Sequence, residues 1–244
     1  MSKLASVLGA AFLLVGASQA WAQEGGGSIS GTVKLDGAVK PRKLNAAMDA
    51  DKYCGPQRAG QDVLGEEVIA GANGELANVF VWVKKGVKGK FEAPKDAKEI
   101  DQLKCIYHPH IVALQVNQEL VIKNSDDTMH NIHAVLKLNK EFNEGQAAKG
   151  MTATKKFGIQ EIGAKIKCDV HSWMGAWLFV VDHPFFAVTK PDGTYKIDKL
   201  PAGTYELEFW HEKFANGKET KTVTVSVTLG DKEAKTQDHT FTAK

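Results

Sequence analysis

The sequence predicts an all-β protein built from two β-sandwiches. Runs of alternating apolar and polar residues recur along the chain, and turn-forming Gly, Pro, Asn and Asp residues separate them. After residue 60 no long amphipathic helix pattern appears. The chain has 244 residues, 43% of them hydrophobic and 25% charged, which suffices for one large or two small domains with buried cores.

The first 22 residues are predicted to be a signal peptide. Lys3 precedes an uncharged apolar run over 4–16, and Ala20-Trp21-Ala22 forms an A-x-A cleavage site. The apolar run is short for a bilayer span, and no later stretch approaches the roughly 18 apolar residues that a span needs. We therefore expect a periplasmic or secreted protein with no stable membrane span in its mature form. A buried or interfacial helix is the alternative interpretation.

Two β-segments are predicted in the first third of the chain. Residues 29–35 alternate and end at the turn Asp36-Gly37, and residues 78–83 are rich in β-branched and aromatic side chains. Between them, residues 45–52 are expected to form a short helix. Residues 84–98 are rich in Lys and Gly and are expected to form an exposed loop.

The rest of the chain is predicted to be strands and hairpins. Central strands are expected over 111–116 and 119–124, and further β-structure where residues 165–167 lead into the segment around Cys168 and residues 177–181 run out of it. Alternating runs over 194–197, 204–210 and 221–229 follow, separated by the turn sequences Pro191-Asp192-Gly193 and Leu200-Pro201-Ala202-Gly203. These runs are typical of a second sandwich.

The segment from Cys168 to Met174 has the composition of a copper site. It reads Cys168-Asp169-Val170-His171-Ser172-Trp173-Met174, and so supplies a thiolate, an imidazole and a thioether within seven residues. Thiolate and thioether ligands favour Cu(I), whereas Cu(II) also accepts imidazole. A second histidine must come from elsewhere, and the segment 124–133, Asn-Ser-Asp-Asp-Thr-Met-His-Asn-Ile-His, follows a predicted strand and provides it.

These two segments resemble the cupredoxins, small type-1 copper proteins, and amicyanin-like members most closely. The first segment matches the pattern N-x-D-x-x-x-H-N-V, with Ile132 in place of Val, and the second matches C-x2-H-x2-M, with Trp173 where the pattern has Phe. The resemblance implies a Greek-key β-sandwich that holds one type-1 copper ion. It also implies that Asn131 joins the two segments and that the ligands are His130, Cys168, His171 and Met174.

Several other His and Cys residues bear on this prediction. His133 competes with His130, but residues three apart on a strand point to opposite faces, so only one is expected at the metal. With Cys168 at the metal, a disulfide between Cys54 and Cys105 is preferred over free thiols or intermolecular pairing. Four histidines lie outside these motifs: His108, His110, His183 and His211. We expect them to be hydrogen-bonded or surface residues, and the alternative, that they form a second metal site, is less favoured.

The C-terminal part resembles a carboxypeptidase-regulatory-like, transthyretin-like domain. The resemblance rests on Gly31-Thr32-Val33 and on the D-G-x-Y and L-P-x-G-x-Y motifs that begin at Asp192 and Leu200. Because the first motif precedes the others by a long stretch, it implies a discontinuous domain, although a tandem arrangement stays open. The predicted domains are a signal peptide over 1–22, a cupredoxin domain over 95–183, and the regulatory-like sandwich over 28–94 and 184–244. Two alternatives stay open for the first cupredoxin strand: it is supplied by residues 78–83, or it is missing.

The predicted function is that of an exported electron carrier. Its partner would be a redox protein such as a cytochrome or a dehydrogenase, and the near-neutral net charge gives no nucleic-acid footprint. In cupredoxins the electron passes through the exposed edge of the loop histidine, which implies His171. Trp173 and Trp177 are candidates for the surrounding docking patch, although a packed position is preferred for Trp177.

Three alternative functions remain open. Copper enzymes such as multicopper oxidases and nitrite reductases need further catalytic copper, often ligated by a histidine beside the cysteine. Here Lys167 and Asp169 flank Cys168, so an enzyme is not expected. Copper delivery and a structural β protein with a vestigial site are the other two.

Overall fold

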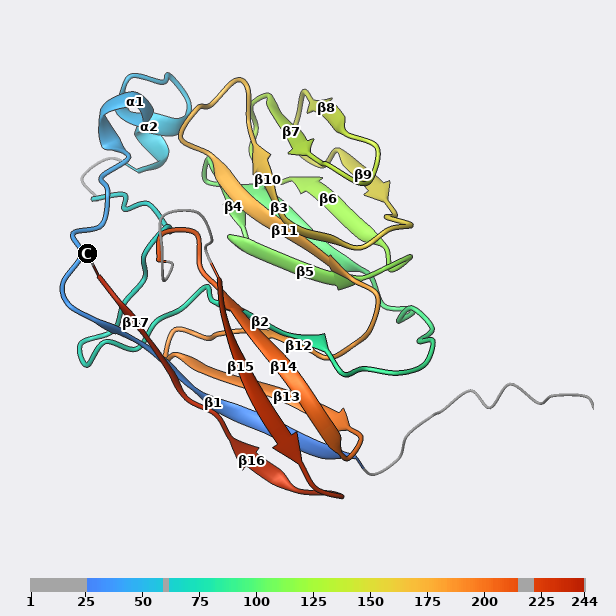
Figure 1. Cartoon of the computed structure of the whole chain (residues 1–244). Helices are drawn as coiled ribbons and strands as arrows, with labels where there is room; N and C mark the ends of the chain where they lie inside the picture. The colour runs from blue at the N-terminus through green and yellow to red at the C-terminus, as the bar shows by residue number, and fades with distance from the viewer. Residues whose placement is uncertain (1–25, 59–61, 215–221, 244) are drawn as a thin grey trace, which may run out of the picture.

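The computed structural model describes residues 26–58, 62–214 and 222–243. Within them, seventeen strands and two short helices form two β-sandwiches that pack against each other (Figure 1). This confirms the predicted all-β class. The predicted signal peptide lies outside the described residues. Neither described helix has the length or the apolar run needed to cross a bilayer.

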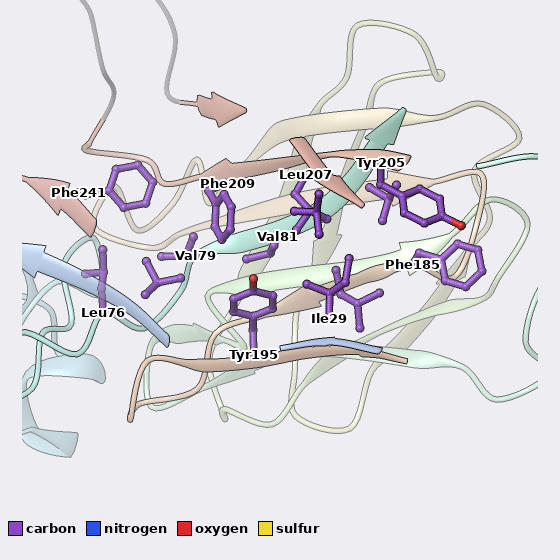
Figure 2. Packing of buried hydrophobic residues seen from close by; sticks show 14 of the residues in the cluster. Ile29, Leu76, Val79, Val81, Phe185, Tyr195, Tyr205, Leu207, Phe209 and Phe241 are labelled. Atoms are coloured by element: carbon purple, nitrogen blue, oxygen red, sulfur yellow. The ribbon is translucent and has the colours of Figure 1, made fainter. Parts of the chain in front are cut away.

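The lower sandwich in Figure 1 is formed by the two ends of the chain. In one sheet β1 pairs with β13, β16 and β17; the other sheet has the order β12-β2-β14-β15. The strands are β1 (Gly27–Asp36), β2 (Phe80–Lys85), β12 (Phe186–Val188), β13 (Thr194–Leu200), β14 (Gly203–Trp210), β15 (Thr222–Leu229), β16 (Ala234–Thr236) and β17 (His239–Thr242). Alternation in β1 and β14 places side chains such as Ile29 and Leu207 in the shared core (Figure 2).

The upper sandwich is formed by the chain between β2 and β12. Its sheets have the orders β5-β11-β10-β7-β8 and β4-β3-β6-β9. The strands are β3 (Lys98–Leu103), β4 (Ile106–His108), β5 (Ile111–Gln115), β6 (Leu120–Asn124), β7 (His130–Val135), β8 (Phe142–Gln146), β9 (Thr152–Lys155), β10 (Glu161–Lys167) and β11 (Gly175–Val181). The lower sandwich is therefore discontinuous around the upper one, as predicted. The residue limits given above for the domains stay predictions.

Aromatic side chains join the two sandwiches. Phe80 of β2 stacks on Phe179 of β11 with ring centroids 3.9 Å apart, and Trp210 of β14 meets Phe179 edge-on at 4.9 Å. Phe80 and Phe179 are fully buried. Because this contact is closely packed and apolar, the two sandwiches are held together by side-chain packing as well as by the chain segments that connect them.

The structure decides two points that the sequence left open. Residues 78–83 do not supply a strand of the upper sandwich, because β2 pairs with β12 and β14 in the lower one. Instead β3 pairs in parallel with β6. The predicted short helix forms as α1 (Asn45–Asp49), and a second helix that the sequence did not predict, α2 (Cys54–Gln57), follows it.

Candidate metal centre

The predicted ligand segments meet at one end of the upper sandwich. His130 is the first residue of β7, Cys168 directly follows β10, and residues 168–174 lead into β11. Strand β10 is hydrogen-bonded to both β7 and β11, with Lys167 opposite His133 on one side and Gly175 on the other. The sheet therefore brings together segments that lie about forty residues apart in the sequence.

Three of the four predicted ligands converge on one point. Nδ1 of His130 lies 2.8 Å from Nδ1 of His171. Together with Sγ of Cys168, one ligand atom from each of these residues lies within 4.8 Å of the others. All three side chains are buried, with exposures of 0%, 4% and 4% for His130, Cys168 and His171. A thiolate and two imidazoles thus face a common, water-excluded point.

Hydrogen bonds donated by backbone amides close the loop that carries Cys168. The backbone amide of His171 donates to Sγ of Cys168 at 3.3 Å. The amide of Met174 donates to the carbonyl of His171 at 2.9 Å, and the amide of Cys168 to the carbonyl of Met174 at 3.4 Å. These contacts keep the sulfur and the imidazole of one loop on the same side.

Met174 lies next to this loop in the core. Its side chain is 2% exposed and belongs to the same apolar cluster as Cys168. Its place as fourth ligand stays a prediction that rests on the family pattern.

Asn131 joins the two ligand segments. Its Oδ1 accepts hydrogen bonds from the backbone amides of Asp169 at 2.8 Å and Val170 at 3.3 Å, and lies 3.2 Å from Sγ of Cys168. Since His130 precedes Asn131 directly, this one side chain fixes the distance between the β7 end and the cysteine loop.

His133 points away from this cluster. Its Nδ1 lies 3.0 Å from Asp169 and its Nε2 lies 2.7 Å from Glu141, and its side chain is partly exposed. The alternation of β7 therefore separates it from His130, and it does not compete for the same point.

The electrostatics of the cluster favour a thiolate. Burial works to raise the pKa of Cys168, but hydrogen bonds from His130, His171 and nearby amides lower this pKa to about 5. Burial opposes protonation of His130, whereas Asp126 and Cys168 raise its pKa above the ordinary value. A thiolate beside the His130 imidazole, whose pKa is raised, is a charge arrangement in which a bound soft metal cation can take the place of the proton.

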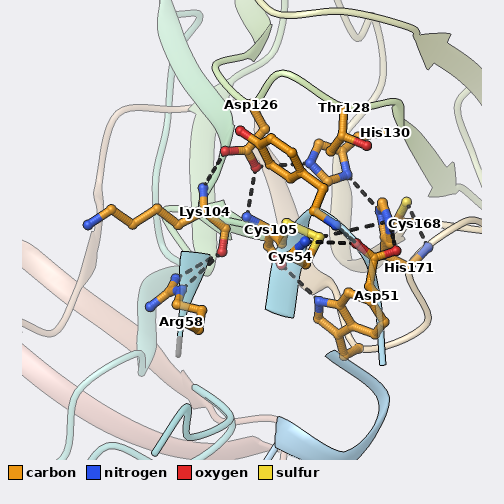
Figure 3. The surroundings of a disulfide bond; sticks show 12 residues. Asp51, Cys54, Arg58, Lys104, Cys105, Asp126, Thr128, His130, Cys168 and His171 are labelled. Atoms are coloured by element: carbon orange, nitrogen blue, oxygen red, sulfur yellow. Dashed lines mark hydrogen bonds and ion pairs between the residues drawn. A yellow bond between two sulfur atoms is a disulfide. The ribbon is translucent and has the colours of Figure 1, made fainter. Parts of the chain in front are cut away.

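A disulfide covers the outer side of both histidines. Cys54 and Cys105 form the predicted bond, and Sγ of Cys54 lies 3.9 Å from Nε2 of His171 (Figure 3). Asp51 approaches the same nitrogen at 3.5 Å. The edge of His171 was predicted to be exposed, and this prediction is wrong, because the helical segment 44–58 lies over it.

Neither tryptophan forms an open patch. Trp173 is half-buried against His171, and its Nε1 donates to the carbonyl of Cys105 at 3.0 Å. Trp177 packs edge-on against Trp210 between the two sandwiches, as preferred for it above.

The histidines outside the motifs form no second metal cluster among the described residues. His110 pairs with Glu212 at 2.5 Å, and Nε2 of His183 lies 2.8 Å from the carbonyl of Val83. Nδ1 of His211 accepts the amide of Lys213. These contacts therefore give no support to a second metal site, the less favoured alternative of the sequence analysis.

The donor set of the cluster fits copper. Two imidazoles and one thiolate are the trigonal ligands of blue-copper sites, with a thioether as the weak fourth ligand. The buried sulfur with its lowered pKa and the facing Nδ1 atoms meet this requirement. The residues present could therefore hold a copper ion, and a type-1 site stays a prediction.

Solved cupredoxins are similar in part to this structure. A copper-containing nitrite reductase (NirK) from Thermus scotoductus SA-01 has 14% identity and a TM-score of 0.34 over 41% of this chain, which spans 25% of that protein. An oxidised amicyanin variant has 20% identity and a TM-score of 0.31, covering 34% of this chain and 81% of amicyanin. A purple cupredoxin from Nitrosopumilus maritimus has 22% identity and a TM-score of 0.30, covering 35% and 99%.

No protein-family model and no curated protein matches this sequence. The predicted likeness of the lower sandwich to a carboxypeptidase-regulatory-like domain has no support from these comparisons.

Sequence reasoning missed two aspartates beside the histidines. Asp126 was noted only as part of the family pattern, yet it lies 2.9 Å from Nε2 of His130. Asp51 was not singled out at all, and no local signal marks it, since its partner His171 is 120 residues away. Only the folded position of the turn between α1 and α2 brings Asp51 and His171 together.

Proposed function

We propose that this chain is an exported type-1 copper protein that carries single electrons between redox partners. The convergence of the buried side chains of His130, Cys168 and His171 on one point is the observation that supports it best. A bound copper would supply one-electron chemistry by alternating between Cu(I) and Cu(II).

The protein's own groups would keep both oxidation states in one geometry. Nδ1 of His130, Nδ1 of His171 and Sγ of Cys168 would hold the ion, with Met174 as the weak fourth ligand. Because these residues sit at strand ends and are tied by Asn131, little rearrangement would accompany electron transfer. Burial of all three ligands excludes water from the ion.

A redox protein, a cytochrome or a dehydrogenase, is the proposed partner. The route of the electron must differ from a direct exit at His171, since residues 44–58 cover that edge. Val170, which lies between Cys168 and His171 in the loop, is 51% exposed and offers one uncovered part of the loop. The proposal does not include an enzyme activity, because only one cysteine loop is present and Lys167 and Asp169 flank its cysteine.

Copper loading tests this proposal directly. The mature chain with one equivalent of copper is expected to show an intense visible band from thiolate-to-copper charge transfer, a type-1 paramagnetic resonance spectrum and a reversible voltammogram. Cys168→Ser should remove the band, while the control Ser172→Ala, an exposed residue of the same loop, should retain it. A colourless copper-loaded wild type would overturn the proposal.

The rate at which bound copper is lost distinguishes a copper-delivery protein from an electron carrier. A carrier retains its ion through repeated oxidation and reduction, whereas a delivery protein loses copper readily to a competing chelator. Rapid loss of copper together with an irreversible voltammogram would favour delivery over electron transfer.

A further inference from the structure

The Cys54–Cys105 disulfide is connected to each histidine of the site by one aspartate. Asp51 accepts the amide of Cys54 through Oδ1 at 2.7 Å, and its Oδ2 lies 3.5 Å from Nε2 of His171. Asp126 accepts the amide of Cys105 through Oδ2 at 2.7 Å, and the same oxygen lies 2.9 Å from Nε2 of His130. Each half-cystine thus shares a carboxylate with one imidazole (Figure 3).

We propose that Asp51 and Asp126 are positioning residues, held by the disulfide, that orient both histidines toward the metal. We call residues 44–58 the cap. The cap carries Asp51 and Cys54, the turn at Lys104-Cys105 carries the other half-cystine, and we call the disulfide that joins the two the brace. The inference rests on the proposed function, because it concerns ligands of the same copper ion.

The chemistry of imidazole explains why two carboxylates are useful. A neutral histidine has one protonated nitrogen and one free lone pair, and the hydrogen bond of one nitrogen decides which atom binds metal. A carboxylate at Nε2 keeps the proton there and leaves Nδ1 free. In both histidines Nε2 faces an aspartate and Nδ1 faces the other ring. An anionic partner also makes the imidazole more basic, which favours Cu(II) over Cu(I).

The two carboxylates are themselves held in place. Lys104 and Cys105 have φ values of 53° and 59°, a left-handed conformation that non-glycine residues rarely adopt, and Asp126 accepts both of their amides. On the cap, Asp51 accepts the amides of Tyr53 and Cys54. These bonds fix each carboxylate before a metal binds.

The cap is attached to the upper sandwich by more than the disulfide. The backbone amide of Asp127 donates to the hydroxyl of Tyr53 at 2.9 Å, and Arg58 donates to the carbonyl of Lys104 at 3.0 Å. A buried apolar cluster supports these contacts, formed by Leu44, Met48, Cys54, Val63 and Cys105. The cap therefore closes the outer edge of His171 as a fixed element.

Asp51→Asn tests the positioning role in the copper-loaded mature chain. The Oδ1 of asparagine still accepts hydrogen bonds from the amides of Tyr53 and Cys54, but its NH2 group cannot accept a hydrogen bond from Nε2 of His171. We expect copper affinity to fall by about tenfold to a hundredfold, with a higher reduction potential and altered copper hyperfine splitting. Asp49→Asn is the matched control, because Asp49 is an exposed residue of α1 and loses the same charge.

The Cys54→Ser/Cys105→Ser double variant tests the brace. It keeps both aspartates, and we expect a change of potential in the same direction and faster electron exchange with hexaammineruthenium, because the cap loses its covalent link beside His171 and is held over that edge only by its remaining contacts. If this variant does not fold, the comparison of Asp51→Asn with Asp49→Asn still tests the positioning role.

The outcomes separate this inference from the proposed function. A blue wild type in which Asp51→Asn and Asp49→Asn have the same affinity, potential and spectrum would overturn the positioning role alone. A wild type that binds no copper, or is colourless with it, would overturn the proposed function and this inference with it.

Discussion

Oδ1 of Asn131 lies 3.2 Å from Sγ of Cys168, which is 37 residues further along the chain. The same oxygen accepts the amides of Asp169 and Val170, the two residues that follow the cysteine. One amide oxygen thus holds both the sulfur and the backbone that presents it. The position of the sulfur relative to His130 depends on this contact, since Asn131 is the next residue on β7.

We expect Asn131→Ala to loosen the cysteine loop. Two backbone amides lose their acceptor, which should lower the free energy of unfolding by about 1–3 kcal/mol. The visible band of the copper form should also shift and broaden. Urea unfolding of the metal-free protein and a visible spectrum check both effects, and Asn131→Asp, which keeps an oxygen acceptor, is the control. Equal stability of the alanine variant and the wild type would contradict the role assigned to this side chain.

Proton release on copper binding should come from histidine and not from the thiol. The pKa of Cys168 is lowered to about 5, so its sulfur is already ionised at pH 7, while the raised pKa of His130 favours a bound proton. Copper should therefore displace protons from imidazole and none from the thiol near pH 7, and fewer at higher pH. Calorimetry in buffers with different ionisation enthalpies measures the number of protons released. Release that does not fall as the pH rises above 7 would indicate a thiol with an ordinary pKa.

Glu161 should make stability depend on acid pH. Its buried carboxylate accepts the amides of Lys137, Leu138 and Asn139, and although burial opposes ionisation, these bonds lower its pKa. Because the folded pKa lies below the unfolded value of 4.5, the stabilisation is complete above pH 4.5 and is lost as pH falls through the folded pKa.

Glu161→Gln should accordingly be less stable than the wild type at pH 7. The difference should shrink in acid, where the wild-type carboxylate is protonated. Urea unfolding at a series of pH values measures it. A difference that stays constant down to the lowest pH would exclude the carboxylate as its cause.

Phe179→Ala should weaken the contact between the sandwiches. Phe179 is fully buried between Phe80 and Trp210, so its removal should cost about 3–5 kcal/mol. We expect calorimetry to show two separated unfolding transitions. Phe241→Ala, which removes a ring from the lower core alone, is the control and should leave the sandwiches coupled. Identical unfolding profiles for the two variants would contradict a specific role of Phe179.

Much of the fold could be predicted because strand alternation is local. Residues 29–35 and 204–210 alternate in the sequence and lie in β1 and β14. Short strands such as β4, β12 and β16 were not predicted, because three residues carry too little periodicity. The sandwich to which residues 78–83 belong was also undecided, since alternation does not identify the neighbouring strand.

The sequence by itself determined the kinds of donor atom and their local spacing. Cys168, His171 and Met174 lie within one short loop, so their proximity follows from chain length alone. With Cys168 assigned to the metal, the sequence favoured a Cys54–Cys105 disulfide, and the structure shows it. The tertiary structure decided what surrounds them: that His130 and not His133 faces Cys168, that α2 covers His171, and that Asp51 and Asp126 meet the two imidazoles. Those contacts join residues up to 120 positions apart through sheet pairing and a disulfide, and no local pattern encodes such distances.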